Sequence, residues 1–474
     1  MVYASLLNGI KSFICKRYNR IQNVAHSIVK NYIMVLIVSS CERKIKLERG
    51  FAMLKHFSIK SLFGRFNYEI NFSNDGVNII TGPNGYGKTT ILKVLDSIAT
   101  QKWDYFTSLD FKKINIITSK GEINISKTKD SIKINDVKIP IRDDKKKVDF
   151  EDYLENSPFL EILDHNLIYD RRVDRVFTFS ELYYRYTFSG RVSPLSLRMA
   201  SSEDDERIRK LGQVSDILGE VRFISAHRLY LKKRDRREGS KIVSVIDSLP
   251  ERLKYLISET YNEYALTANS LDSTYPNRLL DAKQGIDGDN EYQELLRKAN
   301  EKFSKLKEYH LANLAMIEKS EYNEKFSTAL KIYFDDFYKK YEVFKPLIRK
   351  LDLFKQVINN RFTYKKVCIS KEKGFEVVDN KNSRKVIELS DLSSGEQQEI
   401  VLFFDLIFNT KPNYILLIDE PEISLHILWQ KMFLDDLLEI VRDSSINIIV
   451  ATHSPQIINN HWDIQYDLGD INAK

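Results

Sequence analysis

The sequence predicts an α/β fold that combines a parallel β-sheet, a separate antiparallel sheet and a helical insertion. Three observations support this prediction. A glycine-rich loop joins a short β-branched strand to a helix within residues 77–94. The apolar runs at 414–418 and 446–450 lack polar alternation, which is typical of parallel strands covered on both faces. Residues 101–140 alternate as antiparallel strands do, whereas residues 242–360 follow a helical pattern.

The composition indicates a globular protein, because 43% of the 474 residues are hydrophobic and 29% are charged. The net charge of +7 lies entirely in residues 1–52, which hold nine basic and two acidic residues. The rest of the chain is balanced, so net charge gives no reason to expect nucleic-acid binding there. Three widely separated cysteines provide neither a disulfide framework nor a metal clip, which favours a reducing, cytoplasmic setting. The longest clean apolar run, Tyr32 to Val38, has seven residues where a membrane-spanning helix needs about 20.

Residues 1–52 form a basic N-terminal extension in which apolar residues recur at helical spacing from Ile14 to Ile28. Three interpretations stay open. The extension is an irregular segment or an artefact of the chosen start site, a helix packed on the body, or a membrane-binding or targeting segment. The stretch from Met53 to Ile59 has the pattern of a first strand, so translation beginning at Met53 belongs to the first interpretation.

The glycine-rich loop is the strongest local motif, because it fits the pattern G-x-x-x-x-G-K-[ST] between a strand and a helix. Its glycines let successive backbone N–H groups point at phosphate oxygens, and the following helix adds its positive end. The lysine is expected to reach the β- and γ-phosphates of ATP, and the first threonine to ligate Mg²⁺. The expected nucleotide-binding residues of this loop are Gly82, Pro83, Asn84, Gly85, Tyr86, Gly87, Lys88, Thr89 and Thr90.

An acidic pair follows the apolar run at 414–418. Asp419 is placed to hold Mg²⁺, so that Thr89 and Asp419 are the expected metal ligands, and Glu420 is placed to polarise the attacking water. The alternative is an edge strand that runs into an acidic turn. The next apolar run ends at His453, whose imidazole is expected to bind the γ-phosphate or hold the water. A structural histidine is the alternative there.

A fourth motif, Leu392–Gln398, precedes a helical run and places Gly395 24 residues before Asp419. The expected phosphate-binding residues are Ser393, Ser394 and Gly395, because a Ser-Gly pair at a helix N-terminus is suited to bind an anion. Alone, this stretch is also ordinary turn chemistry. In order with the other three motifs it resembles the signature sequence of the ATP-binding cassette (ABC) superfamily, usually Leu-Ser-Gly-Gly-Gln.

The four motifs together resemble the non-transporter branch of the ABC superfamily. This branch contains chromosome-maintenance and DNA-repair ATPases and the overcoming-lysogenisation-defect (OLD-like) ATPases, which include ATPases of anti-phage systems such as Septu, Gabija and retron effectors. The stretch Glu420–His426 is similar to the Glu-Pro-Glu…Leu-His stretch of the OLD-like proteins. The resemblance covers residues 53–235 and 345–474.

The resemblance implies a P-loop NTPase fold of ABC type. It divides the chain into an extension (1–52), a first ATPase lobe with the Walker A loop (53–235), a helical insertion (242–345) and a second lobe with signature, Walker B and switch histidine (346–474). The antiparallel strands would cover the adenine side. Two subunits would pair head to tail, with each Ser393–Gly395 loop closing over ATP held by the partner. Glu420 would then be the catalytic base, His453 the switch residue, and Ser424–His426 the D-loop at the interface.

Two departures from the family pattern limit this transfer. Glu396 replaces the usual glutamine and brings a carboxylate to the signature loop, where it would weaken phosphate contact. The family's Mg²⁺-binding glutamine has no clear equivalent. The segment Val221–Tyr230 is the place to look for it, with His227 either its substitute or a structural residue.

The helical insertion carries an apolar stripe, Tyr292, Leu295, Ala299, Phe303 and Leu306, with expected i,i+4 ion pairs Glu294–Lys298 and Glu301–Lys305. Such a stripe is more often core packing than a partner surface. The length of the insertion suits a short helical arm rather than a long coiled coil that tethers DNA. The cluster from Lys232 to Arg237 and the group Arg171, Arg172 and Arg175 are candidate phosphate contacts, with solvated charge as the alternative.

These features predict a cytoplasmic, Mg²⁺-dependent ATPase whose nucleotide-driven dimerisation, or higher homo-oligomerisation, controls a separate effector or DNA, most plausibly in bacterial anti-phage defence. A DNA-repair or chromosome-maintenance ATPase is the alternative. In a transporter motor the two phosphate-binding loops lie close together in sequence, whereas about 300 residues separate them here. A transporter motor is therefore disfavoured, and no transmembrane partner is expected. Only 21 residues follow His453, so no nuclease domain is expected there, and any cleavage is expected from a separate subunit.

Overall fold

The structure is a computed structural model that describes most of residues 52–472. The internal segments outside the description are 74–75, 142–152, 155–156, 158, 165–166, 173–174, 179–181, 183–201, 236–238, 283, 312–320, 383–384, 411–413, 424 and 442–445. The expectations for the extension at 1–51, for Arg236 and Arg237, and for Ser424 therefore lie outside the described residues.

A five-stranded parallel sheet positions the residues of the expected nucleotide site. Its order is β11-β17-β18-β3-β19, and every neighbouring pair is parallel. The strands are β3 (Val77–Thr81), β11 (Val221–Ile224), β17 (Ile415–Asp419), β18 (Asn447–Ala451) and β19 (Gln465–Asp467). All residues of β3, β17 and β18 are buried, which confirms the expectation drawn from the apolar runs at 414–418 and 446–450.

Alternate side chains of these strands enter two different cores, as the two-residue period of a strand requires. Leu416 and Ile418 pack into one core together with helices of the second lobe and the arm. Ile415 and Leu417 pack into the other core with helix α2 (Lys88–Ala99) and the antiparallel sheet. The sheet is thus covered on both faces, and the predicted α/β class is confirmed.

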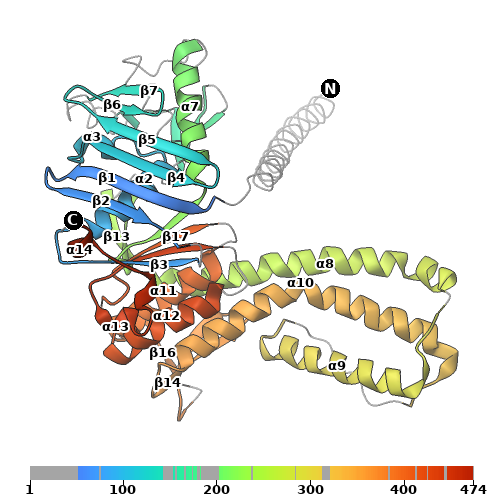
Figure 1. The fold of residues 1–474 in the computed structure, drawn as a ribbon. Helices are drawn as coiled ribbons and strands as arrows, with labels where there is room; N and C mark the ends of the chain where they lie inside the picture. Colours follow the sequence, from blue (N-terminus) through green and yellow to red (C-terminus); the bar gives the residue numbers. More distant parts are fainter. Residues whose placement is uncertain are drawn as a thin grey trace, which may run out of the picture. The chain divides into compact units, whose positions relative to one another are not determined.

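An antiparallel sheet forms the outer layer of the first lobe (Figure 1). Its order is β2-β1-β4-β5-β6-β7. The strands are β1 (Leu54–Leu62), β2 (Phe66–Asn71), β4 (Lys113–Thr118), β5 (Gly121–Lys127), β6 (Ser131–Ile134) and β7 (Val137–Pro140). Ile114 and Ile116 of β4 are buried while Lys113 and Ile117 are exposed, so the alternation read from the sequence corresponds to one buried face.

Smaller elements complete the fold of the described residues. The remaining strands are β8 (Leu160–Asp164), β9 (Leu167–Asp170), β10 (Arg175–Thr178), β12 (Tyr230–Asp235), β13 (Gly239–Ser244), β14 (Lys365–Ser370), β15 (Gly374–Asp379) and β16 (Val386–Ile387). The helices are α3 (Tyr105–Ser108), α7 (Ser202–Leu218), α11 (Ser394–Phe404), α12 (Ile427–Val441), α13 (Pro455–Ile458) and α14 (Leu468–Asn472), with a π-helical turn, η4 (Asp405–Asn409), directly after α11. Short 3₁₀ turns lie at η1 (Ile246–Ser248), η2 (Glu324–Phe326), η3 (Leu389–Asp391) and η5 (Trp462–Ile464).

Three helices form the arm, α8 (Leu249–Asp281), α9 (Gly288–Glu308) and α10 (Ser327–Asn359). Helices α8 and α10 have 33 residues each, which corresponds to about 50 Å at 1.5 Å per residue, and they lie side by side (Figure 1). Arg278 of α8 holds Asp336 of α10 through two hydrogen bonds of 2.6 and 2.7 Å. Helix α10 continues through residue 345, where the insertion was expected to end, and joins the arm directly to the second lobe.

The apolar stripe of α9 is core packing. Tyr292, Ala299, Phe303 and Leu306 are buried, and Leu295 is partly buried against the same core. The expected pair Glu294–Lys298 is present at 2.5 Å. The expected pair Glu301–Lys305 is wrong, because Glu301 binds Arg297, while Lys305 reaches Glu308 on its own helix and Asp352 on α10.

Candidate nucleotide-binding site

The loop between β3 and α2 curls through three glycines with positive φ. The φ angles are 140° at Gly82, 85° at Gly85 and 91° at Gly87, a region that side chains with a Cβ rarely adopt. A Cβ on Gly87 would lie only 2.7 Å from Leu62 Cδ2 of β1, so the loop packs tightly against the antiparallel sheet. A Cβ on Gly85 would meet nothing within 4 Å, which leaves open space in front of the loop.

Lys88 begins α2 and points its ammonium group back into this loop. The residue is buried, and its Nζ donates to the carbonyl oxygens of Gly82 at 2.7 Å and Pro83 at 3.3 Å. These carbonyls hold the cation at the mouth of the loop, where a phosphate oxygen would compete for it. The arrangement fits the binding of an anionic ligand at the N-terminus of α2.

Thr89 and Asp419 meet although 330 residues separate them in sequence. The Thr89 hydroxyl donates to both carboxylate oxygens of Asp419, at 2.9 and 3.1 Å. Asp419 is the last residue of β17, and burial raises the pKa of its carboxyl group, while the Thr89 hydrogen bond opposes that shift. A hydroxyl and a carboxylate at this spacing are oxygen ligands of the kind that Mg²⁺ prefers, so these residues fit the metal expected from the sequence.

Glu420 follows Asp419 with a left-handed backbone. Its φ is 43°, which is uncommon for a residue with a Cβ, and its N–H donates to Ala451 O at 2.8 Å. This bond ties the end of β17 to the end of β18. The turn leaves the Glu420 side chain half-buried rather than packed in the core.

His453 lies just beyond β18, as expected, and its side chain is 49% exposed. Its Nδ1 lies 3.1 Å from Oε1 of Glu422, and its backbone N–H donates to the same oxygen at 3.0 Å. Glu422 therefore fixes the backbone of His453 and lies beside Nδ1, while about half of the His453 side chain is exposed. Glu422 belongs to the stretch Glu420–His426 that resembles OLD-like proteins, but the sequence predicted no role for it.

The signature loop begins α11 with a capping box. Ser393 Oγ accepts from the Glu396 N–H, and the Glu396 carboxylate accepts in return from the Ser393 N–H at 2.9 Å. Lys365 of β14 binds both Glu396 oxygens, at 3.0 and 2.9 Å. Burial favours the neutral acid, but these hydrogen bonds prevail and hold the pKa of Glu396 below its usual value. The carboxylate that departs from the family pattern is thus paired within the chain.

Gln397 fixes the approach to the same loop. Its Nε2 donates to the carbonyls of Leu389, Ser390 and Leu392, at 3.2, 3.2 and 3.1 Å. Ser394 and Gly395 lie in the first turn of α11, where backbone N–H groups have no partner within the helix. The geometry is suited to an anion at this helix end.

The C-terminal strand β19 adds residues that sequence reasoning missed. Asp467 accepts from Thr81 Oγ1 at 3.0 Å, and Gln465 donates to the same hydroxyl at 2.6 Å. Leu468 approaches Gly82, whose added Cβ would lie 3.1 Å from Leu468 Cβ. The strand has three residues, too short for a periodic signal, so no sequence pattern could have found it.

The antiparallel sheet also contributes an exposed aromatic residue. Phe63, in the turn between β1 and β2, is 40% exposed, and its ring edge would lie 3.6 Å from a Cβ on Gly87. Tyr68 donates to the Tyr86 carbonyl at 2.8 Å, and the Phe66 and Tyr86 rings lie 5.0 Å apart. The glycine-rich loop is therefore braced from the antiparallel side.

Other candidates from the sequence have different surroundings. His227 is exposed in the loop after β11, whereas its neighbour Arg228 is buried. Arg172 is committed to the buried Asp170 through bonds of 3.0 and 2.7 Å, so it is not a free phosphate contact. The stretch from Lys232 forms the two-stranded ribbon β12–β13, whose side chains lie outside the described residues apart from its ends.

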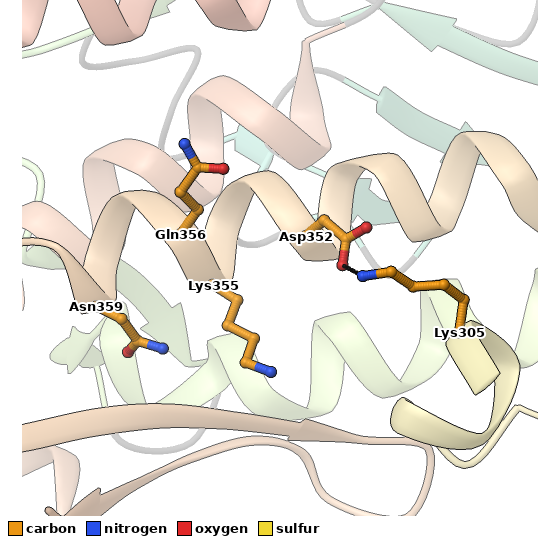
Figure 2. Close-up of a pocket in the computed structure, with 5 residues that line it drawn as sticks. All are labelled: Lys305, Asp352, Lys355, Gln356 and Asn359. Atoms are coloured by element: carbon orange, nitrogen blue, oxygen red, sulfur yellow. Dashed lines mark hydrogen bonds and ion pairs between the residues drawn. The ribbon is translucent and has the colours of Figure 1, made fainter. Parts of the chain in front are cut away.

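A surface cavity of about 420 Å³ lies on the arm, where α9 and α10 meet (Figure 2). Its lining residues are Lys305, Asp352, Lys355, Gln356 and Asn359. Lys305 binds Asp352 at 3.1 Å and Lys355 binds Glu308 at 2.6 Å, so both cations are neutralised by carboxylates. These pairs brace α9 against α10, and they leave no uncompensated charge for an anionic ligand.

The parallel sheet, the loop between β3 and α2 and the acidic end of β17 define a P-loop protein. The family model of the AAA ATPase domain matches residues 53–458. The chain belongs to this family of ATPase domains. The expectation of an ATP-binding P-loop ATPase is confirmed at this level.

Solved structures similar to the chain include two heads of Smc proteins. One is the Smc head domain with an extended coiled coil bound to the C-terminal domain of ScpA from Pyrococcus furiosus, with 14% identity, 86% of this chain and 92% of that chain covered, and a TM-score of 0.34. The other is the SMC head domain from Thermotoga maritima, with 12% identity, 88% and 94% covered, and a TM-score of 0.33. The search of curated proteins returned no match. Among the described helices, none combines the length and apolar character needed to cross a membrane.

Proposed function

We propose that the chain binds and hydrolyses ATP with Mg²⁺ at the P-loop. The single observation that carries this proposal is the convergence of Thr89 and Asp419 at 2.9 Å, beside the buried ammonium group of Lys88. Lys88 would move from the Gly82 and Pro83 carbonyls to the phosphates, and the N–H groups at the start of α2 would bind the same anion. Thr89 and Asp419 would hold Mg²⁺, which when bound neutralises charge on the phosphates.

Glu420 is the proposed base for the attacking water. It follows the proposed metal ligand directly, at a left-handed turn just beyond the end of β17, and its side chain is half-buried. His453, on the neighbouring strand end, is the proposed contact to the γ-phosphate or the water. Parallel neighbours such as β17 and β18 end at the same edge of the sheet, so the two side chains share one side of the site.

Nucleotide-driven pairing of two copies is the proposed output. Ser393, Ser394 and Gly395 present the N-terminus of α11, and the paired Glu396 carboxylate adds no free negative charge there. A loop of this kind suits the phosphates of ATP bound to another copy. The arm, joined to the second lobe through α10, would carry the change to a separate effector or to DNA.

The biological role that we favour is a switch in bacterial anti-phage defence, and it rests on the resemblance of the stretch from Glu420 to His426 to OLD-like proteins. DNA repair or chromosome maintenance is the second candidate. Expression with the neighbouring genes in a phage-challenged bacterium separates the two. Protection that is lost with Lys88→Ala supports defence, whereas unaltered phage growth together with sensitivity to DNA damage supports repair.

The biochemical test is phosphate release by the purified chain. We expect Mg²⁺-dependent hydrolysis that falls at least about 100-fold in Lys88→Ala, because the lysine contacts the charge that transfers. Lys102→Ala is the matched control, since its side chain is 53% exposed and pairs with Asp96. Hydrolysis that survives Lys88→Ala would assign the activity to a contaminant and contradict the proposal.

A further inference from the structure

Glu422 is a buried carboxylate to which the proposed function assigns no role. It is 6% exposed and lies in the turn after Glu420. Its Oε1 accepts hydrogen bonds from the Thr452 hydroxyl at 2.7 Å and from the His453 N–H at 3.0 Å. The same oxygen lies 3.1 Å from His453 Nδ1. One carboxylate oxygen therefore joins the turn after β17 to the end of β18 and to the imidazole ring.

The short distance between Nδ1 and Oε1 favours one of the two neutral forms of the ring. Oε1 accepts from two donors already, and it remains an acceptor whether or not Oε2 is protonated. Nδ1 lies 3.1 Å from the same oxygen without hydrogen-bond alignment, and a protonated Nδ1 is attracted to that oxygen whereas a bare ring nitrogen is repelled by it, so we expect a neutral His453 to carry its proton on Nδ1. Nε2 is then the free acceptor of a ring whose side chain is 49% exposed.

Arg228 supports the carboxylate from the buried side. It is 6% exposed, and its Nη2 donates to the Pro421 carbonyl at 3.1 Å. Its Nε and Nη1 have no hydrogen-bond partner, and neither does Oε2 of Glu422. Burial lowers the pKa of Arg228 to about 10, and the charge of Glu422 is the strongest influence against that shift. The arginine thus stays cationic at neutral pH.

We propose that Glu422 is a positioning residue that holds His453 by its backbone N–H, keeps Nδ1 beside the carboxylate and thereby presents Nε2 to the ATP site. This inference rests on the proposed function for its catalytic consequence, but the orientation of the ring can be tested without nucleotide. Glu422 acts only through His453. It is distinct from Glu420, which we place against the attacking water.

Nuclear magnetic resonance of ¹⁵N-histidine-labelled protein tests the orientation in the absence of ATP. We expect the long-range ¹H–¹⁵N pattern of an Nδ1–H ring for His453, with the signal assigned from its disappearance in His453→Gln. Glu422→Met keeps the side-chain volume but removes the acceptor, and we expect it to shift the ring toward the Nε2–H form. Glu422→Gln keeps an acceptor oxygen and is expected to retain the Nδ1–H form. An Nε2–H ring in the wild type would overturn the proposal without any substitution at Glu422.

A surface pair provides the matched control. His461 Nε2 lies 3.3 Å from Asp435 Oδ1, and the Asp435 side chain is 66% exposed. Asp435→Leu keeps a similar side-chain volume and removes the acceptor of a histidine–carboxylate contact outside the site. It is expected to leave the His453 signals and ATP turnover unchanged, and a change of the same size as in Glu422→Met would show that the effect is not specific to Glu422.

A double-mutant cycle tests the catalytic consequence. Groups that orient a functional histidine typically contribute roughly 10- to 100-fold, so we expect a kcat loss of that size in Glu422→Met and in His453→Ala. Glu422→Gln should give an intermediate kcat. The double variant should fall no further than His453→Ala, while the affinity for ATP changes less than about threefold. Additive losses, or a loss of ATP affinity with unchanged kcat, would show a structural role and overturn the proposal.

The two readouts separate this inference from the proposed function. A wild-type chain that hydrolyses no ATP would contradict the proposed function, yet the resonance experiment would still decide whether Glu422 holds His453. If the wild type hydrolyses ATP but the His453 signals are unchanged in Glu422→Met, the proposed function stands and the positioning role of Glu422 is wrong.

Discussion

The hydroxyl of Thr89 donates to both carboxylate oxygens of Asp419, at 2.9 and 3.1 Å. This contact brings the start of α2 to the end of β17, two elements from opposite ends of the sequence. Burial raises the pKa of Asp419, so its charge costs free energy while no cation is near. We therefore expect a divalent cation, bound together with an anionic ligand, to offset the free-energy cost of this buried charge.

Removal of Mg²⁺ should weaken nucleotide binding. We expect ATP with Mg²⁺ to raise the thermal midpoint of the wild type, and chelation with EDTA to remove about 1–3 kcal/mol of that stabilisation, as expected for a 10- to 100-fold weaker ligand. Asp419→Asn should lose the Mg²⁺-dependent part of the stabilisation by ATP. The ligand-free variant should be no less stable than the wild type, because the substitution removes a buried charge. Thermal unfolding with and without ATP, Mg²⁺ and EDTA measures both. Equal midpoints with and without Mg²⁺ in the wild type would contradict the metal assignment.

Glu420→Gln should separate binding from hydrolysis. The amide keeps the size of the side chain but cannot take a proton from water, so we expect hydrolysis to fall about 100-fold or more while ATP still binds. The variant should accumulate as an ATP-bound dimer or higher oligomer in light-scattering chromatography. Glu439→Gln, which changes an exposed glutamate of α12, is the control. Unchanged turnover in Glu420→Gln would remove this residue from its proposed role.

The central sheet and the P-loop could be predicted because their signals are local. Apolar runs predicted β17 and β18, a short β-branched stretch predicted β3, and the loop of Gly82–Thr89 has a pattern with few other uses. The sequence also predicted Thr89 and Asp419 as ligands of one metal ion, which requires them to lie close together, and parallel strands that end at one edge of the sheet place them so.

Long-range pairings of charged side chains could not be predicted in the same way. Lys365 of β14 neutralises Glu396, and Glu422 holds His453 across two strand ends, but neither contact has a fixed spacing in sequence. The same limit explains the wrong pairing of Glu301 with Lys305, because Asp352 on another helix competes for the lysine. The partner of a charged residue depends on tertiary packing, which periodicity does not report.

Unpairing Glu396 should weaken ATP-dependent association. Lys365→Met leaves the carboxylate of Glu396 without its cation, beside the N-terminus of α11 where phosphate is proposed to bind. We expect the dimer of the Glu420→Gln variant to weaken about fivefold, which corresponds to about 1 kcal/mol for a partly exposed ion pair. Lys365→Arg should restore association, and so should the addition of Glu396→Gln, which removes the charge. Sedimentation at several protein concentrations measures the effect, and equal association in all variants would show that the pair serves only to cap α11.

Glu399 should make stability depend on pH through a buried cluster next to the signature loop. Its carboxylate lies 3.0 Å from Arg361 Nε without hydrogen-bond alignment, and Arg361 also binds Asp436 of α12. Burial raises the pKa of Glu399 to about 8, although the charge of Arg361 opposes the shift, and burial raises the pKa of Asp436 as well.

The raised pKa of Glu399 fixes the direction of the pH effect. Between the ordinary carboxyl range and about pH 8 the folded state keeps a proton that the unfolded state has lost, so folding stability falls as pH rises through this window and then levels off. Glu399→Gln carries no titrating group, so its stability relative to the wild type should increase from pH 5.5 to 8, by about 1.4 kcal/mol per pH unit at most. Denaturant unfolding at several pH values measures the difference, with Glu439→Gln as the exposed control on α12. A difference that stays constant with pH would show that Glu399 is ionised in the folded protein, as a true partner of Arg361.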